Sequence, residues 1–262
     1  MKPTHKVEEC VVYESNKHSY AAASSLSFLL KISSSSSPQA ALALLSSVAK
    51  SIKRAQTHTS SSIKFKALKV VPLKPFIEEL HSNSELHGMA YTLTLKLLAD
   101  IGTQLERIRS EHGLIIPFLS LEDIIVIETR RNEGEGEGEG ETDDASDECT
   151  FVFMNAEKLM QEPGSNKNEL NVDVPLKVNK HTSFLPAELP ESALKRLPMR
   201  FTRTSWCYSL SALCIYALIQ HKFKNGEDDI ERVGRPFLHT SLYFCLKRCL
   251  KPDPEERVLL YV

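Results

Sequence analysis

The sequence predicts an α+β fold with a strand-rich first part and a helical second part. Apolar runs with strand character are concentrated before residue 72, whereas the longest amphipathic helix pattern and a helix that is apolar on nearly all sides come later. The 262 residues, 42% hydrophobic and 25% charged, have the composition of an ordinary globular protein. This length fits one large domain or two small ones.

Three strands are expected in the first part. The runs V-E-E-C-V-V-Y at 7–13 and Y-A-A-A-S-S-L-S-F-L-L-K-I at 20–32 are separated by the polar turn E-S-N-K-H-S. The third run, I-K-F-K-A-L-K-V-V at 63–71, alternates apolar residues with lysines, which indicates a strand with one wet face. Pro72 and Pro75 then interrupt the regular pattern, so a linker is expected there.

Four segments have helical patterns. The first begins near Pro38, after a run of serines that can cap it. Its apolar residues recur at helical spacing, namely Leu42, Leu45, Ala49 and Ile52. The longest, at 84–112, has one apolar stripe and is closed by Gly113. The segment 204–220 is apolar around most of its circumference, which is typical of a central core helix, and a last helix is expected at 240–250.

An acidic insertion is expected between two further strands, at 123–129 and 150–154. Residues 132–149 contain nine acids and no Lys or Arg, in a glycine-rich run of low complexity. Such a run is expected to be disordered in solvent, and its glutamates would repel a phosphate. Without it, 32 basic residues face 25 acidic ones, so the rest of the chain is mildly basic.

The composition excludes several classes of protein. A formal net charge of −2 shows no excess of positive charge of the kind that binds nucleic acid. The six cysteines form no C-x-x-C pair, which favours reduced thiols in an intracellular protein. The first twelve residues lack the apolar core of a signal peptide, and the longest apolar stretch, Trp206–Ile219, is too short to span a bilayer. We therefore expect a soluble, intracellular and cytoplasmic protein with no nucleic-acid or membrane partner.

Three strings in the second part resemble those of protein kinases when taken in order. S-W-C-Y-S-L-S-A-L at 205–213 is similar to the D-x-W/Y-S-L-G start of the kinase central helix, with Trp206 at the Asp position. L-P-A-E-L at 185–189 resembles the Ala-Pro-Glu that ends the activation segment, and K-P-D-P-E-E-R at 251–257 resembles the terminal D-P-x-x-R. The chain looks most like divergent kinase-like proteins of large DNA viruses of protists.

The resemblance implies a two-lobed fold, with a small β-rich N-lobe at 1–75 and a helical C-lobe at 76–262. It also implies a structural ion pair, because in the family the Arg of D-P-x-x-R pairs with the Glu of Ala-Pro-Glu. In this chain the pair would be Glu188 and Arg257.

The positions that hold the nucleotide in kinases are altered. No glycine precedes Gly88, so the glycine-rich phosphate loop is absent. F-L-L-K-I at 28–32 matches the strand that carries the phosphate-binding lysine, which places Lys31 there; a solvated lysine on a strand edge is the alternative. Its usual Glu partner is missing, since 38–55 contains no acid.

The positions that carry catalysis are altered as well. Aligning E-D-I-I-V-I on the family's E-N-I-L-V-I puts Phe118 at the catalytic Asp, and a phenyl ring cannot accept a proton. The same alignment puts Asp123 at the metal-binding Asn, and Asn155 falls at the Asp of Asp-Phe-Gly. Asp123 and Asn155 could hold Mg²⁺ through oxygen ligands, or they could be a hairpin-end Asp and a turn Asn.

The resemblance therefore favours a catalytically inactive pseudokinase, a binding or regulatory module with protein partners. ATP and Mg²⁺ remain conceivable ligands but are not expected to be needed. The alternative is an atypical active Ser/Thr protein kinase that uses Lys31 and Asp123 for Mg-ATP. A mixed α/β scaffold unrelated to kinases is the third hypothesis.

Overall fold

The computed structural model describes most of the chain. The described residues are 2–7, 10–14, 26–32, 37–52, 55–59, 61–83, 88–130, 147–162, 169–172, 176–179, 181–189 and 197–258.

A five-stranded antiparallel sheet forms the first part of the molecule. Its strands, in spatial order, are β1 (Lys2–Val7), β2 (Cys10–Glu14), β3 (Leu26–Ile32), β5 (Ser62–Ala67) and β4 (Gln56–Thr59). The strand predicted at 7–13 is divided, because Val7 pairs with Cys10 and β1 turns back onto β2. The turn predicted at 14–19 therefore lies between β2 and β3, and its residues 15–19 are outside the described residues.

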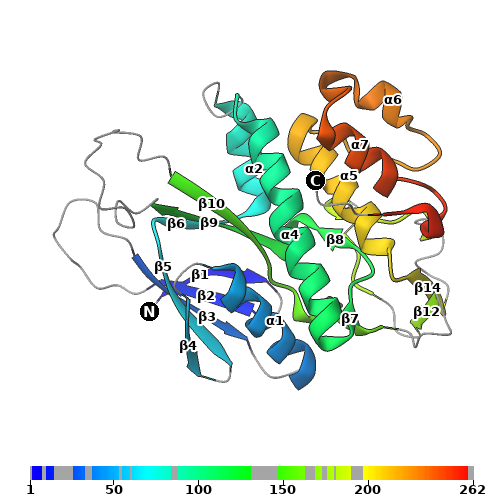
Figure 1. Cartoon of the computed structure of the whole chain (residues 1–262). Helices are drawn as coiled ribbons and strands as arrows, with labels where there is room; N and C mark the ends of the chain where they lie inside the picture. The colour runs from blue at the N-terminus through cyan, green and yellow to red at the C-terminus, as the bar shows by residue number, and fades with distance from the viewer. Residues whose placement is uncertain are drawn as a thin grey trace, which may run out of the picture.

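One face of this sheet is apolar and is covered by α1 (Pro38–Ser51) (Figure 1). Along β3 every second residue is buried: Phe28, Leu30 and Ile32. The predicted first helix is confirmed, and its start follows from Ser37, whose side chain accepts a hydrogen bond from the Ala40 amide. Burial against the sheet, more than helix propensity, stabilises a helix of this length.

A second, three-stranded sheet follows in the order β10 (Asp147–Phe153), β9 (Ile124–Arg130) and β6 (Lys69–Pro72). The strand predicted at 63–71 is divided at Leu68, whose amide donates to the Glu128 carbonyl at 2.7 Å. β10 begins three residues earlier than expected, so the last part of the acidic stretch 132–149 belongs to this strand. Residues 131–146 lie outside the described residues.

The linker predicted around Pro72 and Pro75 is wrong, because α2 (Leu73–Ser82) starts there. Both prolines fit, since the amides of a first helical turn have no partner within the helix and proline has no N–H to lose. The helix is stabilised by its buried side chains Leu73, Phe76, Ile77 and Leu80.

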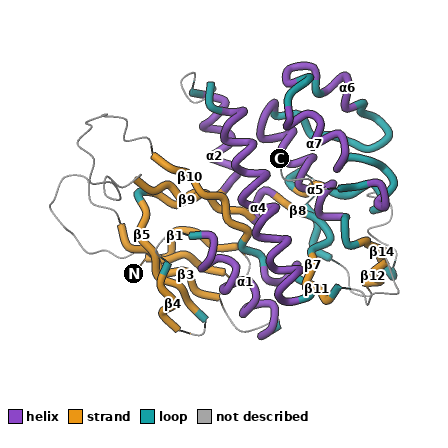
Figure 2. Tube along the Cα trace, viewed as in Figure 1, coloured by secondary structure: helices purple, strands orange, loops and turns teal. Residues whose placement is uncertain are grey.

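Three helices form the centre and the far side of the molecule (Figures 1 and 2). The longest, α4 (Ala90–His112), ends at Gly113 with a φ of 62°, the left-handed conformation expected for this glycine. α5 (Ser205–Ile219) is buried on nearly all sides, as predicted for 204–220, and α7 (Ser241–Cys249) packs against it. A one-turn helix, α6 (Ile230–Val233), precedes α7.

Several short strands lie in the part of the chain between α4 and α5. They are β7 (Leu114–Ile115), β8 (Leu119–Ser120), β11 (Met160–Gln161), β12 (Glu169–Val172), β13 (Ser183–Phe184) and β14 (Met199–Thr202). Most buried apolar side chains belong to one core that runs from the five-stranded sheet to α7. Within the described residues, no helix has both the length and the apolar character needed to cross a bilayer.

Candidate functional site

Asp123 ends a 3₁₀ turn, Leu121–Asp123, that directly follows β8. The turn is closed by a capping box in which the Ser120 amide donates to Asp123 Oδ2 at 2.7 Å. The backbone thus fixes the carboxylate of Asp123, which is 2% exposed. A buried carboxylate in this position is stable only with further donors or a cation.

Both oxygens of Asp123 receive hydrogen bonds from side chains beyond β10. Asn155, the residue aligned with the Asp of Asp-Phe-Gly, donates its Nδ2 to Asp123 Oδ1 at 2.7 Å. Lys158 lies in the next turn, and its ammonium Nζ is 2.5 Å from Asp123 Oδ2. Lys158 is itself 8% exposed, so the pair is a buried ion pair. The structure brings Asp123 and Asn155 together, with a lysine that sequence analysis missed.

Phe118 closes one side of the same network. Its side chain is fully buried, and the Lys158 ammonium lies 4.1 Å from the centre of its ring. An ammonium at this distance is stabilised by the negative face of the ring. Phe118 thus packs beside the cation and, as a phenyl ring, offers no proton acceptor at the position that the sequence alignment assigns to the catalytic Asp.

The network also fixes the segment 181–189. The hydroxyls of Ser120 and Ser183 are 2.8 Å apart, and Lys158 Nζ donates to Ser120 Oγ at 2.8 Å. β8 pairs with β13 through Ser120 and Ser183, and the Leu121 amide donates to the Thr182 carbonyl. Lys158 therefore bridges the turn that carries Asp123 to the segment that leads to Glu188.

The Asp123 site does not fit Mg²⁺. Asp123 is nearly inaccessible and already accepts three hydrogen bonds, one of them from a cation. The oxygen of the Asn155 amide accepts from the Glu157 amide at 3.1 Å, so it too is engaged. A hard cation needs several free oxygen ligands. Among the described residues, no group of three or more His, Cys, Asp or Glu side chains could hold a metal ion.

Lys31 lies away from this network, on the five-stranded sheet. Its side chain is exposed and follows the buried Leu30 along β3. Because side chains alternate across a strand, Lys31 projects from the face opposite to the one that packs on α1. Within the described part of the chain, Lys31 makes no ion pair or hydrogen bond through its side chain.

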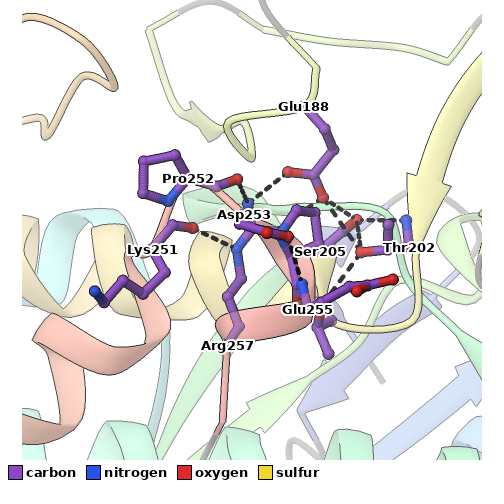
Figure 3. A network of polar contacts seen from close by, with 10 residues as sticks. Glu188, Thr202, Ser205, Lys251, Pro252, Asp253, Glu255 and Arg257 are labelled. Atoms are coloured by element: carbon purple, nitrogen blue, oxygen red, sulfur yellow. Dashed lines mark hydrogen bonds and ion pairs between the residues drawn. The ribbon is translucent and has the colours of Figure 1, made fainter.

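The structure brings Glu188 and Arg257 together in a bidentate ion pair (Figure 3). Arg257 Nη1 is 2.9 Å from Glu188 Oε1, and Nη2 is 2.7 Å from Oε2. Two further guanidinium hydrogens are used as well, since Nε donates to the Lys251 carbonyl and Nη2 to the Pro252 carbonyl. The Arg257 side chain is 0% exposed and that of Glu188 17% exposed, so the pair is largely desolvated, and the guanidinium makes four hydrogen bonds.

The start of α5 completes the surroundings of this pair. Ser205 Oγ donates to Glu188 Oε1 at 2.6 Å, and the Arg257 guanidinium lies 5.0 Å from the centre of the Tyr208 ring. Burial raises the pKa of the Tyr208 phenol, which therefore remains neutral beside the ion pair. The pair joins the segment at 181–189, the central helix and the end of the described chain.

One functional residue, Lys158, was not found from the sequence. It is three residues after Asn155 in N-A-E-K, just beyond the three positions that were compared with Asp-Phe-Gly. A lysine in a polar loop is by default solvated, so its type and position gave no signal. Only the proximity of Asp123, 35 residues earlier, shows that it is an internal counter-ion.

Comparison with solved structures gives the fold class. The chain is similar to a rhoptry kinase from Toxoplasma gondii, with a TM-score of 0.50 and 13% identity over 97% of this chain and 72% of that one. It also matches the PknI kinase domain of Mycobacterium tuberculosis, with a TM-score of 0.45 and 13% identity over 95% of this chain and 85% of that one. No protein-family model and no curated protein matches the sequence.

The chain therefore has a protein kinase-like α+β fold, as the order of its strings had predicted. At 13% identity this likeness concerns the fold, and fold alone does not give function. The function must be argued from the residues of this chain.

Proposed function

We propose that this chain is a two-lobed, catalytically inactive kinase-like domain, a pseudokinase that works as a binding or regulatory module for other proteins. The observation that carries the proposal is the Lys158 ammonium, which lies 2.5 Å from the carboxylate aligned with a metal ligand. An internal cation in this place neutralises Asp123 without metal or nucleotide.

Two features support the same conclusion. Phosphoryl transfer needs a group that orients the nucleophile, and the buried ring of Phe118 stands at that position. It also needs a lysine on the phosphates, and Lys31 is exposed on the sheet face opposite to α1. The aligned metal ligand is thus paired with a lysine, the aligned base is a phenyl ring, and the aligned lysine, Lys31, lies away from both.

The test is a thermal melt of the purified chain with and without Mg²⁺-ATP. Because Asp123 is already neutralised, we expect no change in the melting temperature. A Lys158→Met variant should behave differently: it leaves a buried carboxylate without a cation, which costs about 3–5 kcal/mol. Millimolar Mg²⁺ or Mn²⁺ should then recover part of that loss, because the freed carboxylate and the neighbouring hydroxyls are oxygen ligands.

The matched control is Lys177→Met, which removes a lysine that is 78% exposed. It should melt like the unchanged chain and show no response to metal. A metal-dependent ATP shift in the unchanged chain that disappears in Lys31→Met or Asp123→Ala would contradict the proposal. That result would favour the atypical Ser/Thr kinase, and a phosphotransfer assay would follow.

The remaining features of the proposal rest on the sequence. The partners are proteins, neither nucleic acid nor membrane, and the location is the interior of a cell, in the cytoplasm. The strings at 185–189, 205–213 and 251–257 support a relationship to the kinase-like proteins of large DNA viruses of protists.

A further inference from the structure

Four exposed lysines share one face of the five-stranded sheet. They are Lys6 on β1, Lys31 on β3, and Lys64 and Lys66 on β5, and we call this surface the lysine face. On β5 the lysines alternate with the buried residues Ile63, Phe65 and Ala67, so they project away from the core. The lysine face is therefore opposite to the face that packs on α1.

Strand register brings these lysines close to one another. Lys6 pairs with Val11, and Val11 pairs with Lys31, so one row crosses three strands. Leu29 pairs with Lys64, which places Lys64 diagonal to Lys31, about 7–8 Å away. Lys64 and Lys66 are two residues apart on one strand, a separation of roughly 6.5–7 Å. Like charges at such distances repel and destabilise a sheet.

Within the described residues of these five strands, the lysine face carries no carboxylate. Among the five strands the single acid is Glu14, which pairs with the buried Phe28 and so belongs to the opposite face. In the described part of the chain, none of the four lysines makes an ion pair. Other lysines do: Lys50 pairs with Glu111 at 2.6 Å, and Lys247 pairs with Glu231 at 2.6 Å.

We infer that the lysine face binds an acidic protein segment that lies extended along β5. An extended peptide with a carboxylate at every second residue presents its charges about 6.5–7 Å apart, which matches the spacing of Lys64 and Lys66. Lys31 and Lys6 extend the same basic surface across the strands. The carboxylates of such a peptide balance the charge of the four lysines, so the repulsion between them is relieved on binding.

The chemistry of the face favours a peptide over a nucleic acid. The described side chains on it include no arginine, which would bind phosphate in bidentate fashion. Half-buried Val11 and Leu29 lie between the lysines, and they offer apolar contacts to the alternate side chains of a peptide. The inference does not depend on whether the kinase-like site is inactive.

The experiment measures binding of a fluorescein-labelled peptide, E-G-E-G-E-G-E-G-E, by fluorescence anisotropy at 0.1 M salt. The test variant is Lys31→Thr/Lys64→Thr/Lys66→Thr, since threonine suits a strand and should preserve the fold. The control variant, Lys74→Ser/Arg203→Ser/Arg235→Ser, removes the same charge from exposed positions elsewhere. We expect the test variant to bind at least about tenfold more weakly and the control less than about twofold, because distant charges are screened beyond roughly 10 Å.

The same alternating run occurs in this chain at 133–141, so the measurement is repeated with its five glutamates changed to glutamine. Binding seen only in that background, and lost in the test variant, also supports the inference and identifies the run as a competitor. Absence of saturable binding in both backgrounds would overturn the inference. So would equal losses in the two triple variants, or tighter binding of a 20-nucleotide single-stranded DNA.

Discussion

Two buried carboxylate–cation pairs lie on the helical side of the molecule, and they differ in how the cation is held. Arg257 binds Glu188 with two parallel hydrogen bonds and donates two more to backbone carbonyls. Lys158 binds Asp123 as a point charge and is completed by Ser120 Oγ and the ring of Phe118. One pair joins chain segments 69 residues apart, and the other occupies the position aligned with a metal ligand.

The difference separates architecture from catalysis. The Glu188–Arg257 pair is the one that the kinase resemblance predicted, and it fastens the end of the described chain to the central helix. The Asp123–Lys158 pair has no counterpart in the resemblance; in the pseudokinase that we propose, Lys158 takes the place of an exchangeable cation. Under that proposal, one ion pair supports the fold and the other neutralises the aligned metal ligand.

The largest expected effect comes from breaking the first pair. Glu188→Ala leaves the Arg257 guanidinium, 0% exposed, without its carboxylate, and should cost about 3–5 kcal/mol of unfolding free energy. Urea denaturation followed by circular dichroism measures this loss. The control is Glu256→Ala, which removes a glutamate that is 59% exposed and 3.6 Å from Lys251, and should change stability by less than about 1 kcal/mol. Equal effects of the two variants would contradict the importance of the buried pair.

The second effect is the coupling between Asp123 and Lys158, measured by a double-mutant cycle. Lys158→Met strands a buried carboxylate, whereas Asp123→Asn removes the charge and keeps one of the two oxygens, so either the Ser120 amide or the Asn155 amide loses its acceptor. The double variant should therefore be more stable than the sum of the two losses implies, with a coupling energy of about 1–3 kcal/mol. Additive losses would show that the two groups do not depend on each other.

Much of the fold follows from periodic patterns in the sequence, and the exceptions have physical causes. α4 was predicted because its apolar residues recur at helical spacing over many turns, and α5 because it is apolar around most of its circumference. α2 was missed because Pro72 and Pro75 suggest a break, although both lie where a helix tolerates proline. β4, with the sequence Q-T-H-T, has no apolar alternation and forms a strand only because β5 lies beside it.

The site was predicted less completely than the fold, since its contacts are set by tertiary structure. The positions of Asp123, Asn155 and Phe118 could be inferred from aligned strings. The role of Lys158 could not, because it depends on a residue 35 positions away and on a neighbouring ring. Likewise, strand alternation in the structure places Lys31 on the face of the sheet that points away from α1. The motif F-L-L-K-I alone does not determine on which face the lysine lies.

A smaller effect should follow from removing the Ser209 hydroxyl, which links the strands β8 and β13 to α5. Ser209 Oγ accepts a hydrogen bond from the Leu119 amide at 2.6 Å and donates to the Phe184 carbonyl at 2.5 Å. Ser209→Ala leaves two buried backbone groups without this partner and should cost about 1–3 kcal/mol. Thermal melts would measure this loss of stability. The control is Ser110→Ala, a change at an exposed hydroxyl on α4 that should have almost no effect. Indistinguishable melts would show that the link is dispensable.

The smallest expected effect is a change in thiol reactivity, and it reports on the first pair without a denaturant. Burial raises the pKa of the Cys207 thiol on α5 to about 12, so almost no thiolate forms at pH 8 and iodoacetamide should not modify it in the native chain. Breaking the Glu188–Arg257 pair loosens the start of α5, so Glu188→Ala should allow slow labelling of Cys207, detected by mass spectrometry of peptides. Glu256→Ala should leave Cys207 protected. Rapid labelling of Cys207 in the unchanged chain would contradict the burial of α5. Protection of Cys207 in all three proteins would show that the start of this helix stays folded without the ion pair.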